Sequence, residues 1–331
     1  TTSILQHLDR VSESYCSTIT GIESYNDDFI EITVHSPQVA EHFKAGQFCR
    51  VQFFDKDIKQ LDDTKLAGNA IALLGAKQSI DSQDIQFIIQ RNCVSNELMA
   101  RCRLGQSVAM MDPTGAHFKP RTKSKKLVVI GGAMAYQFIR SVLPEWSEHG
   151  GVIDYMALYA MPEIWHQRIN DLDLHQQISF YQTSSHSSSD TAEAIYTGPW
   201  FENWQTTAKS AVEACLCSAT DIVIFMSPCD LKNFYDYYQL IKPRLQVDHS
   251  VHAAVYTSMQ CMLKGVCAQC LQWQIDPVTK QRTKAVYACS WQHQPFEWID
   301  IDNFGKRLHQ NDFQERISQL WLDYLADTSS I

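Results

Sequence analysis

The apolar pattern of this chain changes character at one place, a basic segment at residues 119–126 (KPRTKSKK). Before this segment, short β-branched and aromatic runs are separated by turn residues, which predicts an antiparallel β-barrel or sandwich. We expect a barrel over residues 1–120. After the segment, apolar strands alternate with helix-compatible stretches, which predicts a doubly wound parallel α/β domain over residues 121–258. The chain should therefore combine an all-β part with an α/β part.

Each expected strand is an apolar run bounded by breaking residues. Before the basic segment, the strands are expected at residues 29–34, 46–54, 85–89 and 108–111. After it, they are expected at 127–130, 152–159, 178–181, 221–226 and 251–257. One helix is expected over 134–143, ending at Pro144, and another over 231–241.

Composition narrows the class of protein. A chain of 331 residues suggests two or three domains, and its formal net charge of −9 with no basic block argues against nucleic-acid partners. No apolar run approaches the roughly 18 residues that a transmembrane helix needs, and the N-terminus does not resemble a secretory signal. Eleven cysteines without an export signal argue against a disulfide framework. We expect a cytoplasmic protein.

Four cysteines in residues 259–302 have the spacing of a metal site, C-x5-C-x2-C-x18-C. They are Cys261, Cys267, Cys270 and Cys289. Thiolates suit an iron–sulfur cluster or zinc. The plant-type [2Fe–2S] pattern is one residue shorter in the first gap, whereas zinc sites usually pair two C-x2-C knuckles and only one is present. The spacing favours [2Fe–2S] over zinc, and His293 nearby is expected to be a surface residue.

Residues 303–331 are expected to form an amphipathic C-terminal helix. Its apolar residues at helical spacing are Leu308, Phe313, Ile317, Leu320, Trp321, Tyr324 and Leu325. We expect this helix to pack on its own domain; docking to a partner through its Trp and Tyr side chains is the alternative.

Gly131 and Gly132 follow an expected strand and precede an expected helix. A dinucleotide pyrophosphate binds at such a turn. The full G-x-G-x-x-G fingerprint is absent, because the sequence reads GGAMAYQF. The two glycines therefore indicate either nucleotide contact or a tight strand-to-helix turn.

The order of these parts resembles the ferredoxin–NADP reductase superfamily, over residues from about 11 to 303. The motifs that carry the resemblance are AGQF at 45–48, CVSNEL at 93–98, DPTG at 112–115, VVIGG at 128–132, MSP at 226–228 and MQC at 259–261. Within the superfamily, the chain looks most like the electron-transfer subunits of type B dihydroorotate dehydrogenases. It also looks like related modules fused to, or partnered with, flavin-dependent NAD(P)H oxidoreductases.

The resemblance implies three cofactors. FAD would lie between the barrel and the α/β domain, with contacts at Ser95 and the backbone near Ile71 and Leu73. NAD(P)H would approach the α/β domain at Gly131 and Gly132. The cluster would pass electrons to a redox partner subunit or a fused dehydrogenase domain.

Several family motifs are altered in this chain, among them the second flavin motif Gly-x-x-Ser/Thr, which reads NCVS at 92–95, and the Gly-rich turn GGGxG, which reads GGAMA at 131–135. The flavin motif Arg-x-[Tyr/Phe/Ile]-Ser reads NAIA at 69–72, without the arginine that holds the FAD phosphates, and Cys-Gly-Pro reads MSP at 226–228. Loss of the arginine removes a bidentate, charge-assisted phosphate contact. The sequence-based hypothesis is that flavin and nucleotide binding are weakened or absent, while ligation of the cluster is retained.

Two functions remain open from the sequence. The first is an iron–sulfur electron-transfer module of an NAD(P)H- and flavin-dependent oxidoreductase; no acid–base or nucleophile constellation is visible, so turnover on a small molecule would happen on the partner. The second is a non-redox scaffold or regulatory module, a degenerate reductase fold held by a structural zinc site with four cysteine ligands. Metal content separates the two.

Overall fold

The computed structural model describes residues 3–7, 16–53, 70–91, 96, 99–158, 163–172, 178–182, 209–255, 268, 270–307, 316, 317, 320 and 324. The chain divides into two compact units. One unit comprises Thr1–His117, Ser258–Cys270 and His309–Ile331, and the other comprises Phe118–Thr257 and Leu271–Leu308.

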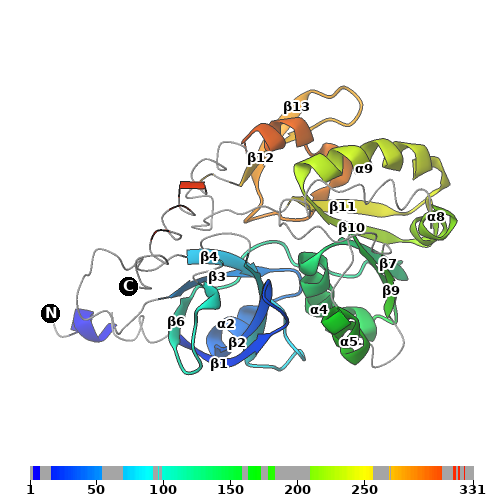
Figure 1. Ribbon diagram of the computed structural model, residues 1–331. Coiled ribbons are helices and arrows are strands. Elements are labelled where there is room, and N and C mark those ends of the chain that lie inside the picture. Colours follow the sequence, from blue (N-terminus) through cyan, green and yellow to red (C-terminus); the bar gives the residue numbers. More distant parts are fainter. Residues whose placement is uncertain are drawn as a thin grey trace. The chain divides into compact units, whose positions relative to one another are not determined.

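The first unit contains a six-stranded antiparallel sheet with the strand order β4-β3-β6-β1-β2-β5 (Figure 1). Its elements are β1 (Cys16–Ser24), β2 (Phe29–His35), α2 (Pro37–His42), β3 (Phe48–Phe53), β4 (Ala70–Leu74), β5 (Asp84–Gln90) and β6 (Ser107–Met110). Side chains that alternate along the strands, such as Ile32, Val34 and Val51, fill a core beneath this sheet. The structure confirms the antiparallel sheet, and its closure into a barrel remains a prediction.

The second unit contains a six-stranded sheet with the strand order β14-β11-β10-β7-β8-β9. Its strands are β7 (Lys126–Gly131), β8 (Val152–Ala157), β9 (Ile178–Gln182), β10 (Asp221–Met226), β11 (Ser250–Val255) and β14 (Gln294–Pro295). The first five are parallel, and β14 runs antiparallel to β11. The sequence prediction of a parallel sheet is confirmed.

Helices cover both faces of the parallel sheet. They are α4 (Ala133–Glu148), α5 (Glu163–Leu172), α8 (Lys209–Ser218) and α9 (Pro228–Ile241). Figure 1 shows α4 and α5 on one face and α8 and α9 on the other. Strands β8 and β9 follow β7 on one side of the sheet, whereas β11 follows β10 on the other side. The strand order therefore reverses between β7 and β10. Sheets of this kind bind ligands beyond the carboxyl ends of their strands at such a reversal.

Helix α4 corrects one sequence-based expectation. Pro144 does not end the helix, which continues to Glu148. A proline inside a helix removes one backbone hydrogen bond and crowds the carbonyl four residues earlier. Trp146, which is 1% exposed, lies beyond Pro144, and burial of its ring favours the extra turn.

A two-stranded antiparallel ribbon, β12 (Leu271–Ile275) and β13 (Arg282–Tyr287), follows the parallel sheet in sequence. Short 3-10 helices span Lys242–Arg244 and Phe296–Trp298, and residues 301–307 are helical. The expectation that His293 is a surface residue was wrong. Its ring is 5% exposed and lies among the rings of Phe118, Phe138 and Phe225, with centroid distances of 4.9 to 5.7 Å.

Most of the expected C-terminal helix lies outside the described residues. Of its apolar positions, Ile317, Leu320 and Tyr324 are described, and each is more than half exposed. In the described parts of the chain, no helix combines the length and the hydropathy that a bilayer crossing requires.

Candidate functional site

The turn after β7 lies at the carboxyl edge of the parallel sheet, where the strand order reverses. Gly131 ends β7, and Gly132 is the N-cap of α4. A Cβ atom on Gly131 would lie 2.8 Å from both the Cβ and the carbonyl oxygen of Phe225 in β10, closer than such atoms come in proteins. The Tyr155 hydroxyl donates a hydrogen bond of 3.0 Å to the carbonyl of Gly132 and helps to hold the turn. Glycine at position 131 is therefore required by packing.

Two helices begin at this edge, and their N-termini differ. The first turn of α4 has no acidic residue, and Gly132 brings no capping side chain. In α9, the Ser227 hydroxyl accepts from the backbone N–H of Asp230 at 3.2 Å and donates to its carboxylate at 2.7 Å. The Asp230 carboxylate already complements the helix dipole and would repel a phosphate. A phosphate therefore fits the start of α4 better than the start of α9, and Gly131 and Gly132 lie at that start.

The predicted flavin contacts on β4 are restricted to its backbone. Ile71 and Leu73 are each 4% exposed and point into the core of the first unit. Strand β4 lies at one edge of the described sheet and pairs with β3. Ser95, the third predicted flavin contact, lies outside the described residues.

Arg50 in β3 is a candidate binding residue that the sequence analysis missed. Its neighbours Cys49 and Val51 are fully buried in the core, so Arg50 lies on the opposite face of the sheet. The register places it opposite Ala72 of β4. Its Nη1 donates to the sulfur of Met111 at 3.6 Å, and its Nε is buried without a hydrogen-bond partner in the described structure. The one signal in the sequence that could have identified this residue is strand alternation, which places an Arg between two apolar positions of a strand.

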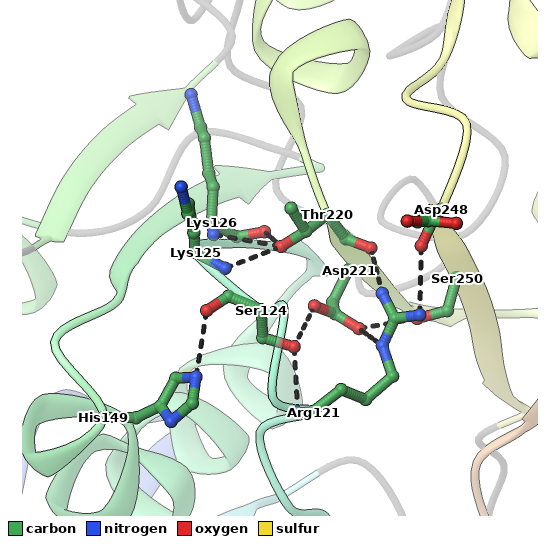
Figure 2. A network of polar contacts seen from close by, with 9 residues as sticks. All are labelled: Arg121, Ser124, Lys125, Lys126, His149, Thr220, Asp221, Asp248 and Ser250. Carbon is green, nitrogen blue, oxygen red and sulfur yellow. Dashed lines mark hydrogen bonds and ion pairs between the residues drawn. The ribbon is translucent and has the colours of Figure 1, made fainter.

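A polar network surrounds Asp221 at the opposite edge of the parallel sheet (Figure 2). Asp221, which is 3% exposed, opens β10, while Ser250 opens β11. Its carboxylate accepts hydrogen bonds from Ser124 at 2.6 Å, Ser250 at 2.6 Å and Arg121 Nε at 2.8 Å. Arg121 also donates to the carbonyl groups of Thr220 and Asp248.

The network determines the charge of Asp221. Burial raises the pKa of its carboxyl, but the hydrogen bonds from Ser124, Ser250 and Arg121 lower it by more, so the pKa lies below its usual range. The ionised carboxylate thus joins β10, β11 and the segment before β7. Open sheets of this kind bind ligands at the carboxyl ends of their strands, so a network at the opposite ends is expected to be structural.

The two described cysteines of the predicted cluster are Cys270 and Cys289, and both are buried thiols outside any disulfide. Leu271 pairs with Tyr287, so the ribbon places Cys270, one residue before β12, and Cys289, two residues after β13, at its open end. Cys261 and Cys267 lie outside the described residues. Among the residues that are described, no three His, Cys, Asp or Glu side chains gather closely enough for a metal site.

Ala268, between Cys267 and Cys270, has an unusual backbone conformation. Its φ of 55° lies in the left-handed region, which costs an alanine about 1–2 kcal/mol. A left-handed residue in a tight loop turns successive N–H groups to one side, as in many iron–sulfur sites. The donor set of thiols and the left-handed conformation of Ala268 both fit the predicted cluster.

Burial makes other cysteines in the described regions poor candidates for chemistry. It raises the pKa of the Cys49 thiol, and it raises the pKa of Cys215, whose thiol also donates to Asp154 at 2.8 Å. Burial likewise raises the pKa of Cys102 to about 11. These thiols remain protonated and are weak nucleophiles and ligands.

Comparison with known proteins gives one relative in sequence. No family model matches the chain. An uncharacterized protein of Rickettsia prowazekii (strain Madrid E) is 27% identical over 302 residues, which cover 91% of this chain and 33% of the relative. The chain thus spans about a third of the length of the curated relative it matches.

Solved structures with a similar fold include the following two. The NADH-dependent reduced ferredoxin-NADP oxidoreductase, studied for flavin-based electron bifurcation, matches 92% of this chain and 97% of its own, with a TM-score of 0.60 and 15% identity. The flavohem-like FAD/NAD binding domain of nitric oxide dioxygenase from Vibrio cholerae O1 biovar El Tor matches 73% of this chain and 98% of its own, with a TM-score of 0.50 and 12% identity. The fold of this chain is therefore that of the ferredoxin–NADP reductase-like proteins.

Proposed function

We propose that this chain is an electron-transfer module of an NAD(P)H- and flavin-dependent oxidoreductase. The fold match over 92% of the chain to a ferredoxin-NADP oxidoreductase carries the proposal. Two further observations support it. The N-terminus of α4, next to the strand-order reversal at Gly131, suits a phosphate, and the β12–β13 ribbon is flanked by the buried thiols of Cys270 and Cys289. The similarity to one specific subunit type, that of type B dihydroorotate dehydrogenases, is part of this proposal.

The proposed parts follow the sequence. Residues 1–120 would form the FAD-binding-like barrel, 121–258 the NAD(P)-binding-like domain, 259–302 the [2Fe–2S] segment and 303–331 a C-terminal helix. Cys261, Cys267, Cys270 and Cys289 would hold the cluster, which when bound supplies a one-electron relay. Electrons would leave to a redox partner subunit or fused dehydrogenase domain, in the cytoplasm.

The residues of the chain itself would bind and orient the carriers. The unopposed start of α4 would hold a nucleotide phosphate, since the dipole and free N–H groups of a helix N-terminus favour anions. The backbone edge of β4 near Ile71 and Leu73, together with Ser95, would position the flavin. The buried surroundings of Cys270 and Cys289 would keep water from the sulfurs, which tunes a metal centre.

Cofactor content tests the proposal. Protein purified without oxygen is expected to contain two iron atoms and two acid-labile sulfides per chain, as a [2Fe–2S] centre requires. The variants C270S and C289S should lose both, while C229S, which alters an exposed thiol, should retain them. A colourless protein with one zinc atom per chain would contradict the proposal and support the zinc-held scaffold.

The same preparation tests the flavin hypothesis. Loss of the motif arginine at position 69 predicts that little FAD is released on heating. Stoichiometric FAD would overturn that expectation and would mean that another group in the chain holds the phosphates.

A further inference from the structure

The side chain of Arg50 is a half-buried cation with no anionic partner among the residues that the structure describes. In the described structure, Nη1 of Arg50 donates one weak hydrogen bond to the Met111 sulfur at 3.6 Å. Its Nε is buried and has no acceptor there. Within the described structure no carboxylate lies within ion-pair distance of it, although the chain has 37 Asp and Glu residues. Asp112, the nearest acidic residue in sequence to Met111, instead lies 4.0 Å from His42.

Such an arrangement is costly for the protein alone. Removing a guanidinium nitrogen from water without giving it an acceptor carries a desolvation penalty, and most buried polar groups in proteins are paired for this reason. A chain that retains the arrangement has either a structural use for the arginine or an anion that binds it. Among the described residues, the Met111 thioether is the one side-chain acceptor that Arg50 contacts. This argues against a structural use of the arginine.

Two small side chains lie near Arg50 on its face of the sheet. Ala72 lies directly opposite it on β4, and Ala109 lies on the same face of β6, opposite Gln52. Neither methyl group is long enough to cover the guanidinium. The fork of an arginine donates two parallel hydrogen bonds to a phosphate, which a lysine does not do. On the face of the sheet formed by β3, β4 and β6, the guanidinium of Arg50 thus lies near the small side chains of Ala72 and Ala109 and beside Met111.

We propose that Arg50 binds a phosphate group of a nucleotide ligand on this face of the sheet. The identification of that nucleotide as FAD rests on the proposed function. Arg50 would then supply, from β3, the positive charge that the altered motif at 69–72 lacks on β4. Arg50 and Ala72 are cross-strand neighbours, so the charge is brought to the same region of the sheet from the adjacent strand.

The test compares R50M with the parent protein, both stripped of bound flavin and titrated with FAD and with riboflavin. R50M is expected to bind FAD about 10- to 100-fold more weakly, the usual cost of losing charge-assisted phosphate contacts. Riboflavin, which has no phosphate, should bind both proteins equally. R103M alters an exposed arginine of the same unit and should bind FAD normally. R50M that binds FAD as tightly as the parent would overturn the proposal.

Stability gives a second readout. Without ligand, R50M should melt at the same temperature as the parent or higher, because an unpaired half-buried cation has been replaced by an apolar chain of similar shape. A structural role would instead lower the melting temperature. If R50M does not fold, R50K keeps the charge but not the fork, and it should still weaken FAD binding several-fold; R50K with the parent affinity would also contradict the proposal.

The same experiment separates this inference from the proposed function. If the parent protein binds no flavin, it is titrated with ADP and with inorganic pyrophosphate. Binding that is lost in R50M would support the phosphate site while contradicting the flavin-dependent function. Absence of binding to every phosphate probe would overturn the inference itself, whatever the cluster content of the protein.

Discussion

Asp221 shows how one buried charge can join three segments of a fold. Its carboxylate is held by Ser124, Ser250 and Arg121, and these contacts lower its pKa although burial alone would raise it. A carboxyl whose pKa is lower in the folded state stabilises the fold above its unfolded pKa of about 3.9. That stabilisation is lost as the pH falls through the lower, folded value.

Replacement of Asp221 by Asn should therefore destabilise the protein in a pH-dependent way. At neutral pH we expect D221N to lose about 2 kcal/mol of unfolding free energy, because charge-assisted hydrogen bonds are lost and Arg121 loses its counter-charge. The difference from the parent should shrink below about pH 4, as the parent carboxyl protonates. Urea denaturation at several pH values measures both effects.

Asp248 provides the control for this experiment. It is an exposed carboxylate that pairs with Lys123 at 2.7 Å, and exposed ion pairs contribute little to stability. D248N should unfold like the parent. A D221N midpoint equal to that of D248N would show that the network does not stabilise the sheet.

Gly131 is a second residue whose replacement has a definite expected result. In G131V, the new side chain would meet Phe225 and Ala135 at less than 3 Å, and these atoms belong to packed backbone and short side chains. We expect a loss of about 1–3 kcal/mol, as for other overpacked positions, measured by urea unfolding. G305A, whose new Cβ would lie 3.5 Å from Pro228, should be neutral or slightly stabilising. Equal stability of G131V and the parent would contradict the packing argument.

Single residues could be predicted from sequence only where local pattern decides their environment. Gly131 was found because it ends an apolar run before a helix. His293 was missed because its burial depends on Phe118, Phe138 and Phe225, which are more than 60 residues away in sequence. Arg50 was missed because its lack of a partner depends on the pairing of β3 with β4.

At the scale of elements, periodicity located the strands well. The expected strand at 221–226 coincides with β10, and that at 127–130 lies within β7, because both are continuous apolar runs in a sheet covered on both faces. Strand β1 was not expected, because its burial pattern alternates over only a few residues and its apolar positions are weak. Helix α4 was expected to stop early, since local rules do not include the burial of Trp146.

Pro144 allows a direct test at this scale. P144A restores a backbone N–H that can donate to the carbonyl of Arg140 and removes the ring from the preceding turn. We expect the unfolding free energy to rise by about 1 kcal/mol, less than the full penalty of a mid-helix proline because the unfolded chain also gains freedom. The urea midpoint measures this. A lower midpoint would mean that the proline geometry is needed to seat Trp146.

For the molecule as a whole, the sequence predicted the type of sheet in each part of the chain. It did not reveal all the residues that could bind a cofactor. The change in the apolar pattern at residues 119–126 correctly indicated an antiparallel sheet followed by a parallel sheet. The spacing of the cysteines alone indicated four metal ligands. Two of them, Cys270 and Cys289, are buried thiols at the open end of the β12–β13 ribbon. Motif loss at 69–72 suggested weak flavin binding, whereas we propose that Arg50 supplies a replacement charge. The proposal depends on the pairing of Arg50 in β3 with Ala72 in β4, which the sequence alone does not reveal.

Anaerobic reduction by NADH or NADPH of the purified protein, first supplied with FAD to pass hydride electrons singly to the cluster, tests the central claim, that this chain transfers electrons, most directly. We expect the visible absorbance of the bound cofactors to bleach and an EPR signal of a reduced [2Fe–2S] centre to appear. C270S and C289S should give no such signal, and C229S should behave like the parent. Protein that contains its full complement of iron, sulfide and flavin yet keeps its oxidised spectrum with both nucleotides would contradict the account.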